Sequence, residues 1–316
     1  MIEQQGGAVP GGTAGIPDSA ILSGAPIALT ARSSARRRLR PYQRTYLWVS
    51  RVVIVAFIAL MLIPIVLVLD ASFSSGSAFS SFSLIPQNPT LQHYQKMFDS
   101  NQVDFLIWMR NSAIVCLATA VLSVTLVTST GYAFSRFRFK GRKYGLMSML
   151  LVQMFPAQMS FIAFYYMLDR IGLLDTFPGL IFVYVGGGVG FNAWLFKGFI
   201  DALPRDLEES AYVDGATPWQ AFYKIILPLT RPMMAVIFIF VLVGNFNEFI
   251  LASWLLRTPA HYTMAVGLRQ FINGQYNQNW TDFAAAAVLA SLPLLVIFML
   301  AQRWLVSGLA AGAVKG

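Results

Sequence analysis

The sequence predicts an all-α integral membrane protein with six transmembrane helices and with both termini in the cytoplasm. The first reason is composition, because 56% of the 316 residues are hydrophobic and only 12% are charged, whereas soluble domains carry about a quarter charged residues. The second is that six apolar stretches have the roughly 20 residues that a helix needs to cross a bilayer core. The third is that Lys and Arg gather beside alternate ends of these stretches.

The six apolar stretches make up a predicted transmembrane domain over 51–306. A helix is expected in each stretch, because backbone groups inside lipid must find their hydrogen-bond partners within the segment. Pro64, Pro156 and Pro293 lie inside stretches and are expected to kink their helices. The predicted spans are 52–69, 111–134, 144–168, 178–200, 232–256 and 283–306.

The distribution of Lys and Arg sets the predicted orientation. Eighteen of them fall before the first span, in the second and fourth loops and at the C-terminal end, and five fall in the other loops. Because cytoplasmic loops carry the excess of Lys and Arg, both termini and the loop 203–228 are expected inside, and the loop 257–282 outside. The net charge of +9 therefore reflects membrane topology, and no nucleic-acid partner is expected.

Residues 1–50 are predicted to form a disordered, basic cytoplasmic tail. The first thirty are rich in Gly, Ala and Pro and hold only two charged residues, which is typical of chains without a packed core. The arginine-rich run 32–40 could contact anionic lipid heads, or it could serve only as a topology signal, which is the interpretation we favour.

The loop 203–228 carries the start and stop signals of two short helices. Asp206, followed three residues later by a glutamate, has the capping-box spacing that starts a helix, and Gly215 ends it in the left-handed conformation. Thr217, with a proline after it, offers the N-cap of a second helix, and Pro228 is expected to end that helix. A helix–turn–helix loop is therefore predicted.

The second helix of this loop is expected to expose Trp219, Phe222 and Tyr223. A cytoplasmic loop exposes such large side chains only where something covers them. The residues alone leave two alternatives open, which are docking of a partner protein and packing against the membrane helices.

The spacing Glu-x-Ala-x3-Gly-x9-Ile-x-Leu-Pro, which begins at Glu209, resembles the EAA loop of ABC-importer permeases, with Ser210 as the one departure. The resemblance implies a type I ABC importer permease fold and a loop that docks on an ATPase subunit. The docking residues that it implies are Glu208, Glu209, Ala211, Asp214, Gly215, Ala216, Trp219, Phe222, Ile225, Leu227 and Pro228.

The stretches 153–157, 214–222 and 282–306, with the last one continuing to 314–316, resemble the MalG-type permeases of binding-protein-dependent maltose/maltodextrin importers, and the similarity covers residues 52–316. It implies a permease subunit of an ATP-driven importer of maltose, maltodextrin or trehalose in the bacterial cytoplasmic membrane. The implied partners are a MalF-type second permease, a MalK-type ATPase dimer, an extracytoplasmic sugar-binding protein and membrane lipid. ATP and Mg would be bound by the ATPase subunits, and no cofactor by this chain.

The same resemblance implies roles for two further segments. The cytoplasmic tail 307–316, with Lys315 and Gly316, would contact the ATPase subunits, the alternative being a frayed terminus. Part of the outward loop would be a scoop that enters the binding protein's pocket, the alternatives being a solvated loop with interfacial aromatics and direct sugar contact. The scoop residues are Asn273, Gly274, Gln275, Tyr276, Asn277 and Gln278.

Polar residues inside spans are costly and are therefore candidates for function. Glu248, with Asn192, Asn245 and Asn247, could line the translocation path, or Glu248 could anchor one helix to another. The two histidines and the single Cys116 have no partners at catalytic or metal-ligand spacing, so a non-catalytic subunit without a metal is expected. The alternative is a self-contained secondary transporter or intramembrane enzyme that uses Glu248.

Overall fold

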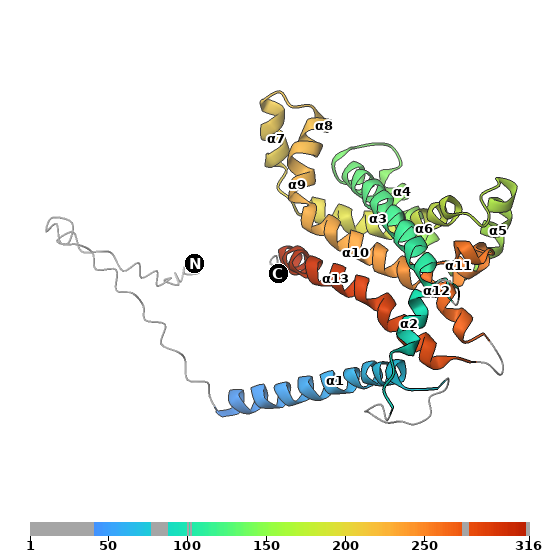
Figure 1. Ribbon diagram of the computed structural model, residues 1–316. Helices are drawn as coiled ribbons and strands as arrows, with labels where there is room; N and C mark the ends of the chain where they lie inside the picture. Colours follow the sequence, from blue (N-terminus) through green and yellow to red (C-terminus); the bar gives the residue numbers. More distant parts are fainter. Residues whose placement is uncertain (1–40, 77–87, 100, 102, 274–277, 314–316) are drawn as a thin grey trace, which may run out of the picture. The chain divides into compact units, whose positions relative to one another are not determined.

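The computed structural model describes residues 41–76, 88–99, 101, 103–273 and 278–313 (Figure 1). Among these residues the only β feature is an isolated bridge between Ser74 and Pro89, so the all-α prediction is confirmed. The predictions that lie outside the described residues are those for 1–40, Gly274, Gln275, Tyr276, Asn277, Lys315 and Gly316.

The chain divides into two units, Met1–Ala59 and Leu60–Gly316, and the division falls within α1. The helices α2 to α13 belong to the second unit. The helices are α1 Pro41–Phe73, α2 Gln92–Phe98, α3 Phe105–Arg136, α4 Arg142–Val152, α5 Phe161–Arg170, α6 Phe177–Asp201, α7 Asp206–Val213, α8 Pro218–Ala221, α9 Leu227–Leu229, α10 Arg231–Asn247, α11 Ile250–Leu255, α12 Met264–Leu268 and α13 Trp280–Ala313.

Four helices in the described part of the chain are long and apolar enough to cross a membrane, namely Thr45–Phe73 of α1, α3, α6 and Trp280–Gln302 of α13. They correspond to the first, second, fourth and sixth predicted spans. A fifth is counted only if Pro218–Leu229 and Arg231–Asn247, which meet at an angle of 72°, are taken as one span. The predicted count of six and the predicted orientation are therefore not confirmed.

The third predicted span, 144–168, is wrong as a continuous helix. α4 ends before the midpoint of this predicted span. α5 begins only after a break that contains Pro156 and a short 3₁₀ turn. Pro156 has an extended ψ of 120°, and its missing N–H cannot continue the hydrogen bonds of a helix. The proline separates two helices instead of kinking one.

The fifth predicted span, 232–256, is interrupted at Glu248, whose backbone is extended with a ψ of 117°. α10 ends just before this residue, and α11 begins two residues after it. The Glu248 carboxylate accepts hydrogen bonds from the backbone N–H groups of Leu251 at 2.8 Å and Ala252 at 3.0 Å. It thereby satisfies donors that the first turn of a helix leaves without intrahelical partners.

α3 and α6 pack closely against each other, and α10 packs against both. A Cβ atom on Gly131 of α3 would lie 3.2 Å from the carbonyl oxygen of Ala193 and 3.2 Å from the amide nitrogen of Lys197 on α6. Both distances are shorter than ordinary carbon contacts of about 3.5–4.0 Å. Glycine at this position therefore allows the two backbones to approach closely.

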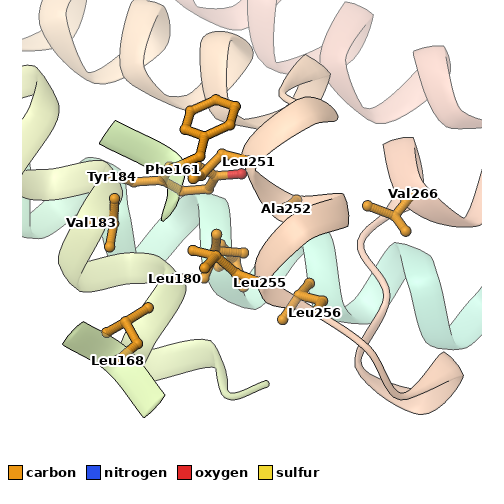
Figure 2. Packing of buried hydrophobic residues seen from close by; sticks show 11 residues of the cluster. Phe161, Leu168, Leu180, Val183, Tyr184, Leu251, Ala252, Leu255, Leu256 and Val266 are labelled. Carbon is orange, nitrogen blue, oxygen red and sulfur yellow. The ribbon is translucent and has the colours of Figure 1, made fainter. Parts of the chain in front are cut away.

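A buried apolar cluster joins the interrupted segments to α6 (Figure 2). Phe161 of α5, Tyr184 of α6 and Leu251 of α11 lie together in it, and Leu180 of α6 lies beside Leu255 of α11. α5 and α11 are therefore held by side-chain packing against α6, although the chain is interrupted before each of them.

Asp175, in the turn before α6, ties that turn to the segment after α11. Its carboxylate accepts hydrogen bonds from the Arg257 N–H at 2.8 Å, from the Thr258 N–H at 3.2 Å and from the Thr258 hydroxyl. Its own N–H donates to the Leu255 carbonyl at 3.1 Å. The residue has a left-handed φ of 57°, which Asp and Asn adopt more readily than other non-glycine residues.

We predict that Asp175 makes stability depend on acid. Partial burial disfavours its charged form, but the hydrogen bonds from the Thr258 side chain and from the Arg257 and Thr258 N–H groups outweigh that effect and lower its pKa from 3.8 to about 2. Because the folded-state pKa is depressed, the stabilisation is complete above 3.8 and is lost as the pH falls toward 2.

Thermal unfolding of the wild type and of Asp175→Asn between pH 5 and pH 2 measures this effect, because asparagine keeps the left-handed backbone and removes the titration. The difference in unfolding temperature between the wild type and the variant should become smaller as the pH falls from 5 to 2. A difference that is independent of pH would show that the charge of Asp175 does not support this corner.

Candidate functional site

The loop after α6 is a helix–turn–helix, as predicted (Figure 1). Gly215 ends α7 with a left-handed φ of 84°, and the Ala216 N–H donates to the Ala211 carbonyl at 2.9 Å, which closes the turn in the manner of helix C-caps. Thr217 caps α8 with its side chain, and the Gln220 side chain completes a capping box. The turn is therefore fixed by backbone conformation and by two side chains.

Two details of the predicted loop are wrong. Asp206 is the first residue of α7, but no side-chain hydrogen bond caps that helix. Pro228 does not end the second helix, which continues through the π-helical segment Phe222–Ile226 into α9. The proline stands in the first turn of α9, and the change of direction by 72° follows at Thr230.

Glu208 fixes α7 to the end of α3. Glu208 is only 3% exposed. Its carboxylate accepts a hydrogen bond from the Tyr132 hydroxyl at 2.9 Å and forms an ion pair with Arg136. Arg136 also donates to the Leu203 carbonyl at 3.2 Å. The predicted docking residue Glu208 therefore faces the bundle, and its contacts make it a positioning residue for the loop.

The sequence reasoning missed Tyr132 and Arg136 as parts of this site. Arg136 lies two residues after the second predicted span, where it serves in the sequence only as a topology signal. No local pattern in the sequence shows that Glu208 is buried, so its need for a nearby cation such as Arg136 becomes visible only in the structure.

The aromatic residues of the second helix divide between two faces. Trp219 is 69% and Tyr223 is 61% exposed, whereas Phe222 is 5% exposed. The Phe222 ring lies 4.5 Å from the Tyr132 ring, measured between centroids. The prediction that all three are exposed is therefore wrong for Phe222, since the register of the helix turns that ring into the cluster formed by α3, α6 and α10.

The remaining docking candidates lie around the exposed face of the loop. Four of them are exposed, and five are half-buried along the sides. The exposed ones are Glu209, Asp214, Gly215 and Trp219, and the half-buried ones are Ala211, Ala216, Ile225, Leu227 and Pro228. Val213, at the end of α7, is 88% exposed and extends the apolar part of this face.

Glu248 anchors one helix to another in this structure. Besides capping α11, its carboxylate accepts a hydrogen bond from the Tyr184 hydroxyl of α6 at 2.6 Å. The side chains of Asn192 and Asn247 donate to carbonyls one turn earlier in their own helices, at 2.9 and 2.8 Å, and Asn245 is half-buried. None of the side-chain hydrogen bonds described for these four residues joins two of them, and a role in the translocation path stays a prediction.

Two scoop candidates fall within the described residues. Asn273 accepts a hydrogen bond from the Arg269 guanidinium at 2.9 Å, and Gln278 accepts one from the Trp280 indole N–H at 3.0 Å. Both contacts join residues close together in the sequence, so they stabilise only the two ends of the predicted scoop. The role of this segment as a scoop stays a prediction.

We predict that the Arg136–Glu208 pair behaves as a buried ion pair. Glu208→Ala should lower the free energy of unfolding by about 3 kcal/mol or more, because it leaves the Arg136 charge buried without a partner. The double variant Glu208→Ala with Arg136→Met should lose less, since no charge is then stranded. Thermal unfolding in detergent compares both variants with Arg136→Met alone, and a loss in the double variant equal to the sum of the two single losses would argue that the side chains are not coupled.

Comparison with known proteins identifies the family. Residues 126–310 match the model of the binding-protein-dependent transport system inner membrane component. The chain is 42% identical over 286 residues to the maltose/maltodextrin transport system permease protein MalG of Vibrio vulnificus (strain YJ016), which covers 85% of this chain and 96% of that protein. It is 42% identical over 265 residues to the galactooligosaccharides transport system permease protein GanQ of Bacillus subtilis (strain 168), and the match covers 83% of this chain and 94% of that protein.

The MalG protein of Escherichia coli (strain K12) is 41% identical over 291 residues, covering 87% of this chain and 97% of that one. The fold is similar to that of a chain of a bacterial ABC transporter involved in the import of alginate, with a TM-score of 0.73 and 24% identity. The match covers 84% of this chain and 99% of that one. Since the family model matches more than half of the chain, and these relatives match it over nearly their whole length, the chain belongs to the inner membrane components of binding-protein-dependent transport systems.

Proposed function

We propose that this chain is the transmembrane permease subunit of an ATP-driven importer of maltose/maltodextrin-type oligosaccharides, and that its loop 203–228 receives the movement of an ATPase subunit. The observation that carries the proposal is the division of this loop into two faces. One face is fixed to α3 through Glu208 and Phe222. The other leaves Trp219 and Tyr223 largely exposed, and large exposed side chains of this kind mark an interaction surface.

The geometry suggests how movement would pass through the chain. When ATP binding closes the ATPase subunits, the docked α7–α8 pair would move with them. The buried pair between Glu208 and Arg136 would carry that displacement into α3, and the close contact at Gly131 would carry it into α6. The cavity between this chain and a second permease would then open outward, and hydrolysis would return it inward.

The relatives support the substrate class and the partners. Maltose/maltodextrin and galactooligosaccharides appear in the names of MalG and GanQ proteins that are 41–42% identical to this chain, so an oligosaccharide is proposed here, with trehalose as the alternative to maltose. The proposed assembly contains a MalF-type permease, a MalK-type ATPase dimer that binds ATP and Mg, and an extracytoplasmic sugar-binding protein, in the bacterial cytoplasmic membrane. This chain would be non-catalytic within it and would bind no cofactor.

The roles of the segment 273–278 as a scoop and of Lys315 and Gly316 as an ATPase contact are part of this proposal, and they rest on the resemblance alone. The alternative of a self-contained transporter or enzyme that uses Glu248 is not supported by any particular contact. The Glu248 carboxylate already accepts hydrogen bonds from Tyr184, Leu251 and Ala252. These structural contacts are a sufficient reason for a glutamate at this position.

We predict that the exposed aromatics bind the ATPase. Trp219→Ala with Tyr223→Ala should reduce the amount of ATPase subunit that copurifies with the permease by at least about tenfold, which corresponds to the loss of about 1.4 kcal/mol or more expected for interface aromatics. The unfolding temperature of the permease itself should not change, because both side chains are exposed.

Two control variants accompany this test. Tyr166→Ala removes an aromatic side chain that is 62% exposed on α5, and it should leave copurification unchanged. Phe222→Ala removes the buried neighbour and should lower stability by about 3 kcal/mol. Retention of the ATPase by the Trp219 and Tyr223 double variant would contradict docking at this face.

We predict that the left-handed turn at Gly215 is required for coupling. A Cβ atom there meets nothing within 4 Å, so substitution acts through the φ of 84° and not through a clash. Gly215→Ala should therefore reduce uptake into proteoliposomes more than Gly215→Asn, since asparagine tolerates this conformation. Gly198→Ala, at an open position within α6, is the control, and equal uptake by all variants would count against a role for the turn.

A further inference from the structure

The turn that joins α3 to α4 forms an open hollow of about 530 Å³ beside the end of α6. Cations and aromatic residues alternate along this turn, which reads Arg-Phe-Arg-Phe-Lys-Gly-Arg-Lys-Tyr over 136–144. The residues that line the hollow include Phe139, Gly141, Arg142, Lys143, Tyr144 and, from α6, Lys197. Three of these six residues are cationic, and none is acidic.

The hollow lies where two candidate membrane spans end. The span of α3 ends at Arg136, and the span of α6 ends at Asp201, one helical turn beyond Lys197. The lining aromatics are also exposed, since Phe139 is 45% and Tyr144 is 75% accessible. Aromatic residues at the ends of spans are typical of the level of the lipid headgroups, so the hollow opens at that level of the bilayer.

The positive charge of the hollow is only partly neutralised. Lys197 forms an ion pair with Asp201, and Arg142 donates to the Ser135 carbonyl at 3.2 Å, which carries no charge. Of the ion pairs among the described residues, none includes Arg142 or Lys143. Arg142 and Lys143 therefore face the hollow without forming an ion pair, although Arg142 also interacts electrostatically with Asp201.

The start of α4 strengthens this field. α4 has 11 residues and begins at Arg142, directly after Gly141, whose φ is 88°. No side chain caps its first N–H groups, and its first turn holds no acidic residue. Helix N-termini favour anions, so the helix adds to the effect of the two cations at the same place.

We propose that this hollow binds the phosphate of an anionic phospholipid headgroup, with Arg142 and Lys143 as its cationic ligands. Basic pockets between transmembrane helices are suited to such headgroups, and the exposed rings of Phe139 and Tyr144 provide apolar contact for the adjoining part of the lipid. An acidic surface of the ATPase partner is the competing occupant. The aromatic lining and the position at the ends of two spans favour the lipid.

The test compares two variants that remove equal charge from the same turn. Arg142→Gln with Lys143→Gln removes two cations that line the hollow, and Arg138→Gln with Lys140→Gln removes two exposed cations that do not. The assembled importer complex is purified with each, titrated with phosphatidylglycerol or phosphatidylcholine in detergent, and examined by native mass spectrometry for bound lipid.

Phosphatidylglycerol should bind at least about tenfold more weakly to the first variant than to the second, because each cation near an anionic headgroup contributes several-fold to binding. Phosphatidylcholine should bind both alike. Lys143→Gln alone should give part of the loss, and this variant keeps the Arg142 hydrogen bond in case the double variant does not assemble.

Three outcomes would overturn the proposal. Equal weakening in both double variants would mean that the turn is only a general basic surface. Loss of the ATPase subunits from the first variant, with lipid binding intact, would identify a protein occupant. Displacement of bound phosphatidylglycerol by inorganic phosphate at equal concentration would assign the hollow to a soluble phosphate compound instead of a lipid.

Discussion

The buried ion pair between Arg136 and Glu208 is the interaction on which the architecture of this chain depends. A carboxylate in a short surface helix and a guanidinium at the end of a membrane helix are both withdrawn from water, at side-chain exposures of 4% and 8%. Such a pair tolerates little separation, because either charge alone would be stranded in a medium of low polarity. The loop is therefore a rigid extension of α3, held additionally by Tyr132 and Phe222.

The same physical rule explains the interruptions of the helices. A backbone N–H that leaves a helix inside a membrane must find another acceptor. At the break between α10 and α11 the acceptor is the Glu248 carboxylate, which also holds α6 through Tyr184. One ionisable residue thus satisfies the backbone and joins two helices, which is a sufficient reason for its presence in an otherwise apolar segment.

The sequence predicted the structure correctly where the conformation depends on neighbouring residues in the chain. Four spans, the left-handed turn at Gly215 and the N-cap at Thr217 follow from composition and from single residues, and the structure confirms them. The breaks near Pro156 and Glu248 were missed, because hydropathy does not report backbone conformation. The inward direction of Glu208 and Phe222 depends on partners 76 and about 90 residues away along the chain, an order of separation that no local pattern reports.

The π-helical segment Phe222–Ile226 sets the direction of the exposed aromatic face. A π turn accommodates an extra residue within a helix, and one residue of an α-helix corresponds to a rotation of about 100°. Deletion of a single residue here would keep the helix and its composition but would rotate Trp219 relative to α10. The aromatic face would then turn away from its present direction, so the length of this segment determines where that face points.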